Sequence, residues 1–235
     1  MTGKRVLIDT SKCIGCKACQ IACQQWHSLP AEDTSFTDGY QNPLDMSGAN
    51  LTVTKFIEKV ESGKVKWLFF KDQCRHCVIP RCQACPLGAI SKVSGGIVLI
   101  DPLKCKPHEC SGSPIKPCQA NCPYNIPKYV YKKNGAYVDT IARKCDLCYD
   151  RFSHPKLPAA SKKPACMATC PPGIIKIAAA DTALTYAIKR AKQLRTRGYP
   201  NATVYPKQNT LWGETRIIWV ILDSASVYGL PGSSY

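Results

Sequence analysis

The sequence contains no long hydrophobic run. Its most apolar late stretch, Ile217–Leu222, has six residues, and residues 1–9 lack the apolar core of a signal peptide. A membrane-spanning helix needs roughly 20 consecutive apolar residues. We therefore expect no membrane span, and any export of the chain would depend on the signal of a partner.

Familiar catalytic motifs are also missing. The sequence has no phosphate-binding glycine loop, no nucleophile elbow and no metal-hydrolase helix. These absences argue against nucleotide-dependent enzymes, serine hydrolases and zinc hydrolases. We expect a chain without a catalytic site of its own.

Acidic residues are scarce. The chain has 16 Asp and Glu against 32 Lys and Arg, so its formal net charge is +16. Clustered basic residues would attract nucleic acid or an anionic membrane. Here the lysines are scattered, and a bound anionic cofactor is a second explanation for the excess. We predict no nucleic-acid binding.

Cysteine, in contrast, is abundant, with 16 residues in a chain of 235. Disulfides, zinc and iron–sulfur clusters can all use so many cysteines, so the spacing has to distinguish them. Cys-Pro closes three of four groups, and a β-like stretch follows each closure, as in a repeated ferredoxin unit. The groups are Cys13, Cys16, Cys19 and Cys23; Cys74, Cys77, Cys82 and Cys85; Cys105, Cys110, Cys118 and Cys122; and Cys145, Cys148, Cys166 and Cys170.

The first group illustrates the chemistry. Cys13, Cys16 and Cys19 place three thiolates within seven residues, which suits three irons of one [4Fe–4S] cubane. In two-cluster ferredoxins the fourth cysteine of such a motif binds the other cluster, so a sequence group is not a ligand group. Each oxidised cubane with four thiolates carries a charge of 2−, so three would lower the net charge to about +10 and four to about +8.

Two other interpretations of the cysteines stay open. Zinc sites also use C-x2-C pairs, so a zinc-stabilised structural or nucleic-acid-binding module is one alternative. A disulfide scaffold is the other. Repeated Cys-Pro closures are foreign to zinc ribbons and favour iron–sulfur clusters. Each intact site offers four thiolates and so leaves no iron open for substrate chemistry, which favours electron transfer.

Hydrophobic alternation predicts short strands and one long helix, an α+β fold. The only convincing amphipathic helix spans residues 182–196, and residues 28–50 have the composition of a loop. Residues 61–64 form a turn between two of the strands. The predicted strands are residues 5–9, 51–56, 65–70 and 215–222, with two shorter ones inside residues 88–101.

Several segments resemble the electron-transfer β subunits of formate dehydrogenases. The resemblance covers about residues 1–178, and its segments are Cys13–His27, Tyr40–Pro43, Trp67–Cys77 and Cys122–Pro127. The β subunits of nitrate, dimethyl sulfoxide and polysulfide reductases share the cysteine groups, and these proteins and hydrogenases are the alternatives. The Gln-Gln-Trp, Tyr-Gln-Asn-Pro and Trp-Leu-Phe sequences favour formate.

The resemblance implies that the cysteine groups exchange their fourth members. The first cluster would then use Cys13, Cys16, Cys19 and Cys170, the second Cys145, Cys148, Cys166 and Cys23, and the third Cys74, Cys77, Cys82 and Cys122. This exchange implies two interleaved ferredoxin-like modules with long loops. The outer one comprises residues 1–65 and 143–235 and ends in a helix and strand extension, and the inner one comprises residues 66–142.

The four remaining cysteines depart from the family pattern. Cys105, Cys110, Cys118 and Cys122 read C-x4-C-x7-C-x3-C instead of C-x2-C-x2-C-x3-C, and Cys82-x2-Cys85 is one residue short. After the exchange, both irregularities fall on one site. We therefore expect three clusters, with four as the alternative. The degenerate site comprises Cys85, Cys105, Cys110 and Cys118, as free thiols or disulfides.

The resemblance also implies partners. A catalytic subunit with a molybdenum or tungsten bis-pterin would supply electrons from formate, and a soluble redox protein such as a cytochrome c would accept them. Without an anchor helix, and with disulfides suspected, we expect the periplasm, with the cytoplasm as the alternative.

Some residues near the cysteines have several possible roles. Three basic side chains, Lys17, Lys71 and Arg75, are candidates for tuning the cluster potentials. The histidines fit surface or supporting positions better than ligand positions, and the tryptophans fit packing against clusters or a partner. They are His27, His76, His108 and His154, and Trp26, Trp67, Trp212 and Trp219.

Overall fold

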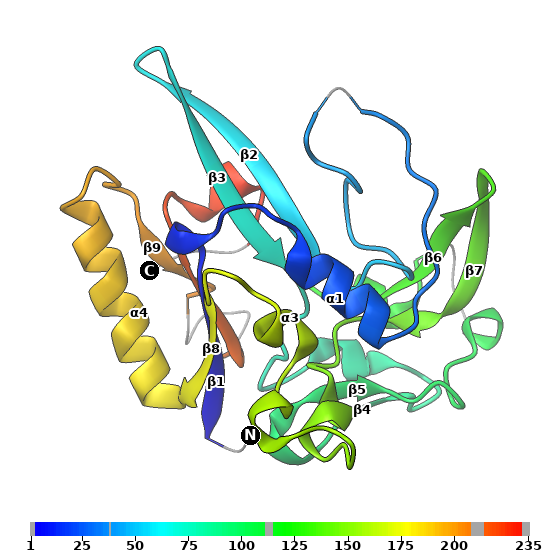
Figure 1. Ribbon diagram of the computed structural model, residues 1–235. Coiled ribbons are helices and arrows are strands. Elements are labelled where there is room, and N and C mark those ends of the chain that lie inside the picture. Colours follow the sequence, from blue (N-terminus) through cyan, green and yellow to red (C-terminus); the bar gives the residue numbers. More distant parts are fainter. Residues whose placement is uncertain (1–2, 38, 111–114, 208–213, 232–235) are drawn as a thin grey trace.

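The computed structural model describes residues 3–37, 39–110, 115–207 and 214–231 (Figure 1). Its largest sheet has four strands in the order β8-β1-β10-β9. β1 lies antiparallel to β8 and parallel to β10, so both ends of the chain meet in one sheet. The strands are β1 (Lys4–Asp9), β8 (Ile175–Ala179), β9 (Thr203–Tyr205) and β10 (Ile217–Ile221).

Helix α4 (Ala180–Arg195) covers one face of this sheet (Figure 1). Ala183, Ala187 and Ala191 recur every four residues, and these small side chains face the sheet together with Leu194. The predicted helix at residues 182–196 is confirmed, as are the first and last strands. β10 is buried along its whole length because α4 covers one face and the main core the other.

A long hairpin extends from the body of the protein. It consists of β2 (Val53–Glu61) and β3 (Lys64–Asp72), which pair antiparallel along their full length. Both strands are longer than the sequence predicted, because polar residues alternate with apolar ones beyond the buried part. The predicted module boundary after residue 65 lies within β3.

Two smaller hairpins and three short helices carry the cysteine segments. The hairpins are β4 (Ile90–Lys92) with β5 (Val98–Ile100), and β6 (Lys128–Lys133) with β7 (Ala136–Arg143). The helices are α1 (Ala18–Trp26), α2 (Pro117–Ala120) and α3 (Ala165–Ala168), and α1 lies beside α3. Single 3-10 turns span Thr10–Lys12, Arg81–Ala84, Ser94–Gly96, Pro107–Glu109, Tyr149–Phe152, Ala159–Ser161 and Ala225–Tyr228.

The core between the large sheet and the hairpin contains a buried charge. The Arg75 guanidinium is bonded to Asp72 and lies 4.7 Å from the ring centre of Tyr124 and 5.1 Å from that of Trp219. Trp219 is fully buried, in agreement with a packing role. Trp212 lies outside the described residues.

None of the described helices combines the length and the apolarity that crossing a membrane requires.

Candidate metal centres

The sixteen cysteines converge in four places, and segments far apart in the chain contribute the cysteines of each. At the first, Cys13, Cys16 and Cys19 meet Cys170 around a cavity of about 340 Å³. Gly15 makes this loop possible. Its φ is +66°, and a Cβ there would lie 2.7 Å from Cε1 of Phe69. Burial raises the pKa of the Cys13 thiol to about 11.

At the second place, Cys23 on α1 meets Cys166 on α3 and the loop that follows β7. Burial raises the pKa of Cys145 and Cys148, and the thiols that add to the effect are those of Cys23 and Cys166. Two backbone N–H groups donate to sulfur: Leu147 to Cys145 Sγ at 3.4 Å and Ala165 to Cys148 Sγ at 3.4 Å. Such bonds stabilise a thiolate.

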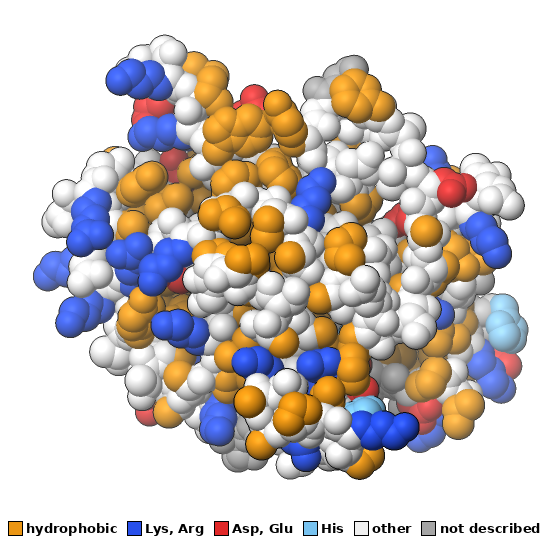
Figure 2. Space-filling view, viewed as in Figure 1, with side chains coloured by type: hydrophobic (Ala, Val, Ile, Leu, Met, Phe, Trp, Pro, Cys, Tyr) orange, Lys and Arg blue, Asp and Glu red, His pale blue; other side chains and the backbone are white. Residues whose placement is uncertain are grey.

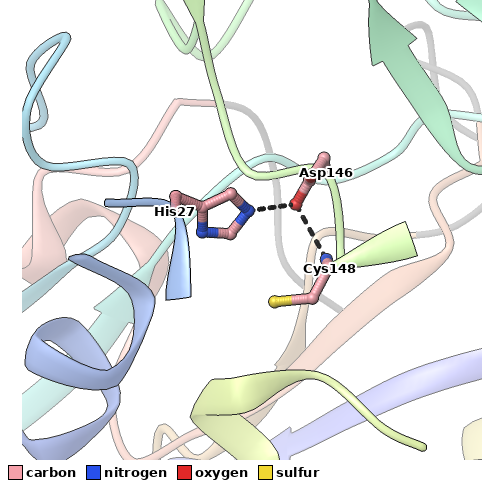
Figure 3. Close-up of side chains that lie close together, drawn as sticks. All are labelled: His27, Asp146 and Cys148. Atoms are coloured by element: carbon pink, nitrogen blue, oxygen red, sulfur yellow. Dashed lines mark hydrogen bonds and ion pairs between the residues drawn. The ribbon is translucent and has the colours of Figure 1, made fainter. Parts of the chain in front are cut away.

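His27 and Asp146 form a pair beside this second place (Figure 3). Nε2 of His27 lies 2.8 Å from Oδ1 of Asp146, and the same oxygen accepts a hydrogen bond from the Cys148 N–H. The pair therefore ties the end of α1 to the loop of Cys145 and Cys148. The ligand atoms of His27, Asp146 and Cys148 lie within 4.8 Å of one another, but Cys148 already faces the thiols of Cys23 and Cys166.

At the third place, Cys74, Cys77 and Cys82 meet Cys122 around a cavity of about 430 Å³. Burial raises the pKa of Cys77 and of Cys82 to about 12. The His76 N–H donates to Cys74 Sγ at 3.4 Å and the Ile126 N–H to Cys122 Sγ at 3.5 Å. Arg75, Tyr124 and Lys144 also line this cavity.

The four cysteines with irregular spacing form a fourth place of the same kind. Cys85, Cys105, Cys110 and Cys118 line one cavity of about 330 Å³ between β4, β5 and β7. The Ala142 N–H donates to Cys105 Sγ at 3.2 Å, and burial raises the pKa of Cys118 to about 11.

The four thiols of this set face a common space, as those of the first and third sets do. The irregular spacing of these cysteines therefore does not keep the four thiols apart. Free thiols or disulfides at this place stay a prediction.

These donor sets fit [4Fe–4S] clusters. A cubane needs four thiolates around one space, and binding of the metal releases the thiol protons. Zinc accepts four thiolates as well, so the donors alone do not exclude it.

The other singled-out residues occupy different environments. His76 is fully buried, and its Nδ1 accepts a hydrogen bond from the Val98 N–H, whereas the His108 side chain is 77% exposed. His154 packs edge-on against Trp26. Lys144 lines the third cavity and was missed from the sequence, although it directly precedes a cysteine.

Comparison with known proteins identifies the cofactor. Residues 65–180 match the family described as 4Fe-4S dicluster domain, and residues 4–25 match a 4Fe-4S binding domain. Together with the α+β fold and the convergent thiols, these matches define an iron–sulfur protein of the ferredoxin type. The [4Fe–4S] prediction is confirmed, and a zinc module has no support.

Relatives that align with most of this chain identify the family more closely. The chain is 39% identical to the iron–sulfur subunit of the nitrate-inducible formate dehydrogenase of Escherichia coli strain K12, over 96% of this chain and 71% of the relative. It is 38% identical to the formate dehydrogenase iron–sulfur subunit of Haemophilus influenzae, over 96% and 67%. A third relative is formate dehydrogenase 2 subunit beta (cytochrome c-553) of Nitratidesulfovibrio vulgaris, at 38% over 85% and 86%. The chain belongs to the iron–sulfur electron-transfer subunits of formate dehydrogenases, as its sequence predicted.

Proposed function

We propose that this chain relays electrons between a formate-oxidising subunit with a molybdenum or tungsten bis-pterin and an external redox protein. The convergence of four thiols at each of four places carries the proposal. Each [4Fe–4S] cluster, when bound, takes up and passes on one electron. The chain supplies the ligands, excludes water and sets the local charge.

We assign the ligands by convergence. Three sets are those implied by the family resemblance: Cys13, Cys16, Cys19 and Cys170; Cys23, Cys145, Cys148 and Cys166; and Cys74, Cys77, Cys82 and Cys122. We propose that Cys85, Cys105, Cys110 and Cys118 hold a fourth cluster rather than a degenerate site. Its cavity is as large as the first, and a backbone N–H points at one sulfur, as at the second and third places.

Counting iron and acid-labile sulfide tests the cofactor assignment. Anaerobically purified chain should contain about sixteen of each, four per cluster. About twelve of each would contradict the fourth site and leave the other three. Zinc without iron would overturn the whole proposal.

The catalytic subunit is proposed to dock over the first place. Several exposed aromatic and aliphatic side chains belong to the segments around it, and Figure 2 shows hydrophobic side chains over the β2–β3 hairpin and beside it. Tyr40 packs edge-on against Trp67, and Ile14 lies in the loop between Cys13 and Cys16. An apolar patch rich in aromatic residues is typical of the centre of a protein interface.

Substituting Tyr40 tests the docking surface. Tyr40 is 66% exposed, and Tyr40→Glu should weaken assembly with the catalytic subunit by about tenfold or more, because it places a charge in an apolar interface. The affinity would be measured by titrating one purified subunit into the other. Tyr186→Glu is the control, since Tyr186 is 38% exposed on α4, outside the hairpin and the Tyr40 segment. Equal affinities for both variants would contradict the docking surface.

Electrons are proposed to leave near the fourth place. Lys104 and Lys106 are exposed beside Cys105, and a basic rim suits a redox protein with an acidic face. A cytochrome c is our proposed acceptor, supported by the cytochrome c-553 in the name of one relative. A periplasmic location is part of the proposal, with the cytoplasm as the alternative.

A further inference from the structure

Lys71 is a fully buried cation near the end of β3. Only 1% of the residue is exposed. Its ammonium group donates to Thr52 Oγ1 at 3.0 Å and to Gln73 Oε1, both of which are neutral. Among the described residues, no carboxylate lies within ion-pair distance of Lys71.

The other two basic candidates are already satisfied elsewhere. The Arg75 guanidinium is paired with the Asp72 carboxylate. Lys17 donates to the backbone carbonyls of Tyr40 at 3.1 Å and Asn42 at 3.0 Å, near the surface. Burial of a charge is unfavourable unless an opposite charge compensates it. Of these three candidates, Lys71 is therefore the buried cation whose counter-charge is still to be identified.

The sulfur atoms around Lys71 belong to two different sets. Lys71 lines the cavity of the first set. Burial by itself would lower the pKa of Lys71, but nearby cysteines in their thiolate form, as when a metal is bound, raise it above its ordinary value. Those thiolates are Cys19 of the first set and Cys23, Cys145 and Cys166 of the second.

We propose that the Lys71 ammonium lies between the first and second cluster sites and raises the reduction potentials of both. The inference rests on the ligand sets proposed above. One-electron reduction adds a negative charge to a site and neither forms nor breaks a bond. A buried cation close to both sites stabilises that added charge at each of them, because little water screens the attraction. Lys71 thus favours the reduced form at both neighbouring sites.

A redox titration of the assembled complex, followed by electron paramagnetic resonance, tests this role. In Lys71→Met, the ratio of reduced to oxidised cluster at a fixed potential should fall at least about tenfold at the first and second sites, a shift of about 59 mV for one electron. The third and fourth sites should keep their potentials. Lys71→Arg should restore most of the shift, because it retains the charge.

Lys66→Met is the matched control. Lys66 lies on the same strand, but its side chain is 38% exposed and pairs with Glu61, so water screens its charge. Its removal should leave all potentials unchanged. If Lys71→Met loses iron, Lys71→Gln keeps a hydrogen-bond donor without the charge and should show the same shift.

Different results would overturn the role of Lys71 and the proposed function. Unchanged potentials in Lys71→Met or Lys71→Gln, with full iron content, would overturn the role of Lys71. Equal shifts at all four sites would also overturn it, since the effect would not be local. Iron missing from the wild-type chain would instead overturn the proposed function.

Discussion

Replacing both Cys166 and Cys170 by alanine is expected to remove about eight iron atoms per chain, although these cysteines are only four residues apart. Cys166 faces Cys23, Cys145 and Cys148, whereas Cys170 faces the cavity of the first set. Each substitution therefore deletes a ligand of a different cluster. Iron and sulfide analysis of the single and double variants measures the effect.

A second double variant with the same number of lost thiols is the control. Cys13→Ala with Cys170→Ala should remove only about four iron, because both residues line the first cavity. If replacing both Cys166 and Cys170 also removed only about four iron atoms, the assignment of these two thiols to different sites would be wrong.

These variants should also stop electron transfer. Loss of a supporting residue around a metal commonly reduces activity 10- to 100-fold, so loss of a direct ligand is expected to reduce formate-dependent acceptor reduction by about 100-fold or more. Formate oxidation with an artificial dye that takes electrons directly from the catalytic subunit should continue. A dye-linked activity that fell equally would indicate that the complex had not assembled.

Arg75→Met is expected to destabilise the fold by about 3–5 kcal/mol. The substitution leaves the Asp72 carboxylate buried without its guanidinium partner and removes a cation from the Tyr124 and Trp219 rings. Asp72 has a lowered pKa, although burial opposes the shift, because Arg75 and Lys55 attract its charge. This stabilisation is present above the unfolded pKa of about 3.9 and is lost as pH falls through the lower folded value, so pH 7 is suitable for the measurement.

The control for Arg75 uses the same carboxylate. Lys55 bonds Asp72 at 2.9 Å, but its side chain is 23% exposed, so Lys55→Met should cost about 1 kcal/mol or less. Anaerobic urea unfolding, followed by tryptophan fluorescence, would compare the midpoints. Similar midpoints for the two variants would show that burial of the Arg75–Asp72 pair does not increase its contribution to the stability of the fold.

Local patterns predicted most of the secondary structure. The α4 helix was visible because its apolar positions recur with helical spacing before Gly198 and Pro200. The β2–β3 hairpin was recognised, but its strands were predicted too short. Their outer parts alternate weakly and are stabilised by cross-strand pairing, which a single strand does not reveal.

The fourth set of cysteines shows what sequence spacing did not reveal. The C-x4-C-x7-C spacing predicted a lost cluster with free thiols or disulfides. In the structure, Cys85, Cys105, Cys110 and Cys118 nevertheless line one cavity. Loop length is a poor guide here because a longer loop costs little extra entropy when its ends are held together.

By itself, the sequence determined the cofactor and the protein class, since closely spaced cysteines and repeated Cys-Pro closures are local signals of [4Fe–4S] binding. Only the tertiary structure decided which thiols share a space, because Cys13 and Cys170 meet across more than half of the chain. It also distinguished Lys71 from Lys17 and Arg75, which look equivalent in the sequence. Burial and the nearest counter-charge depend on residues that the fold brings together from distant segments, and these determine what a lysine does.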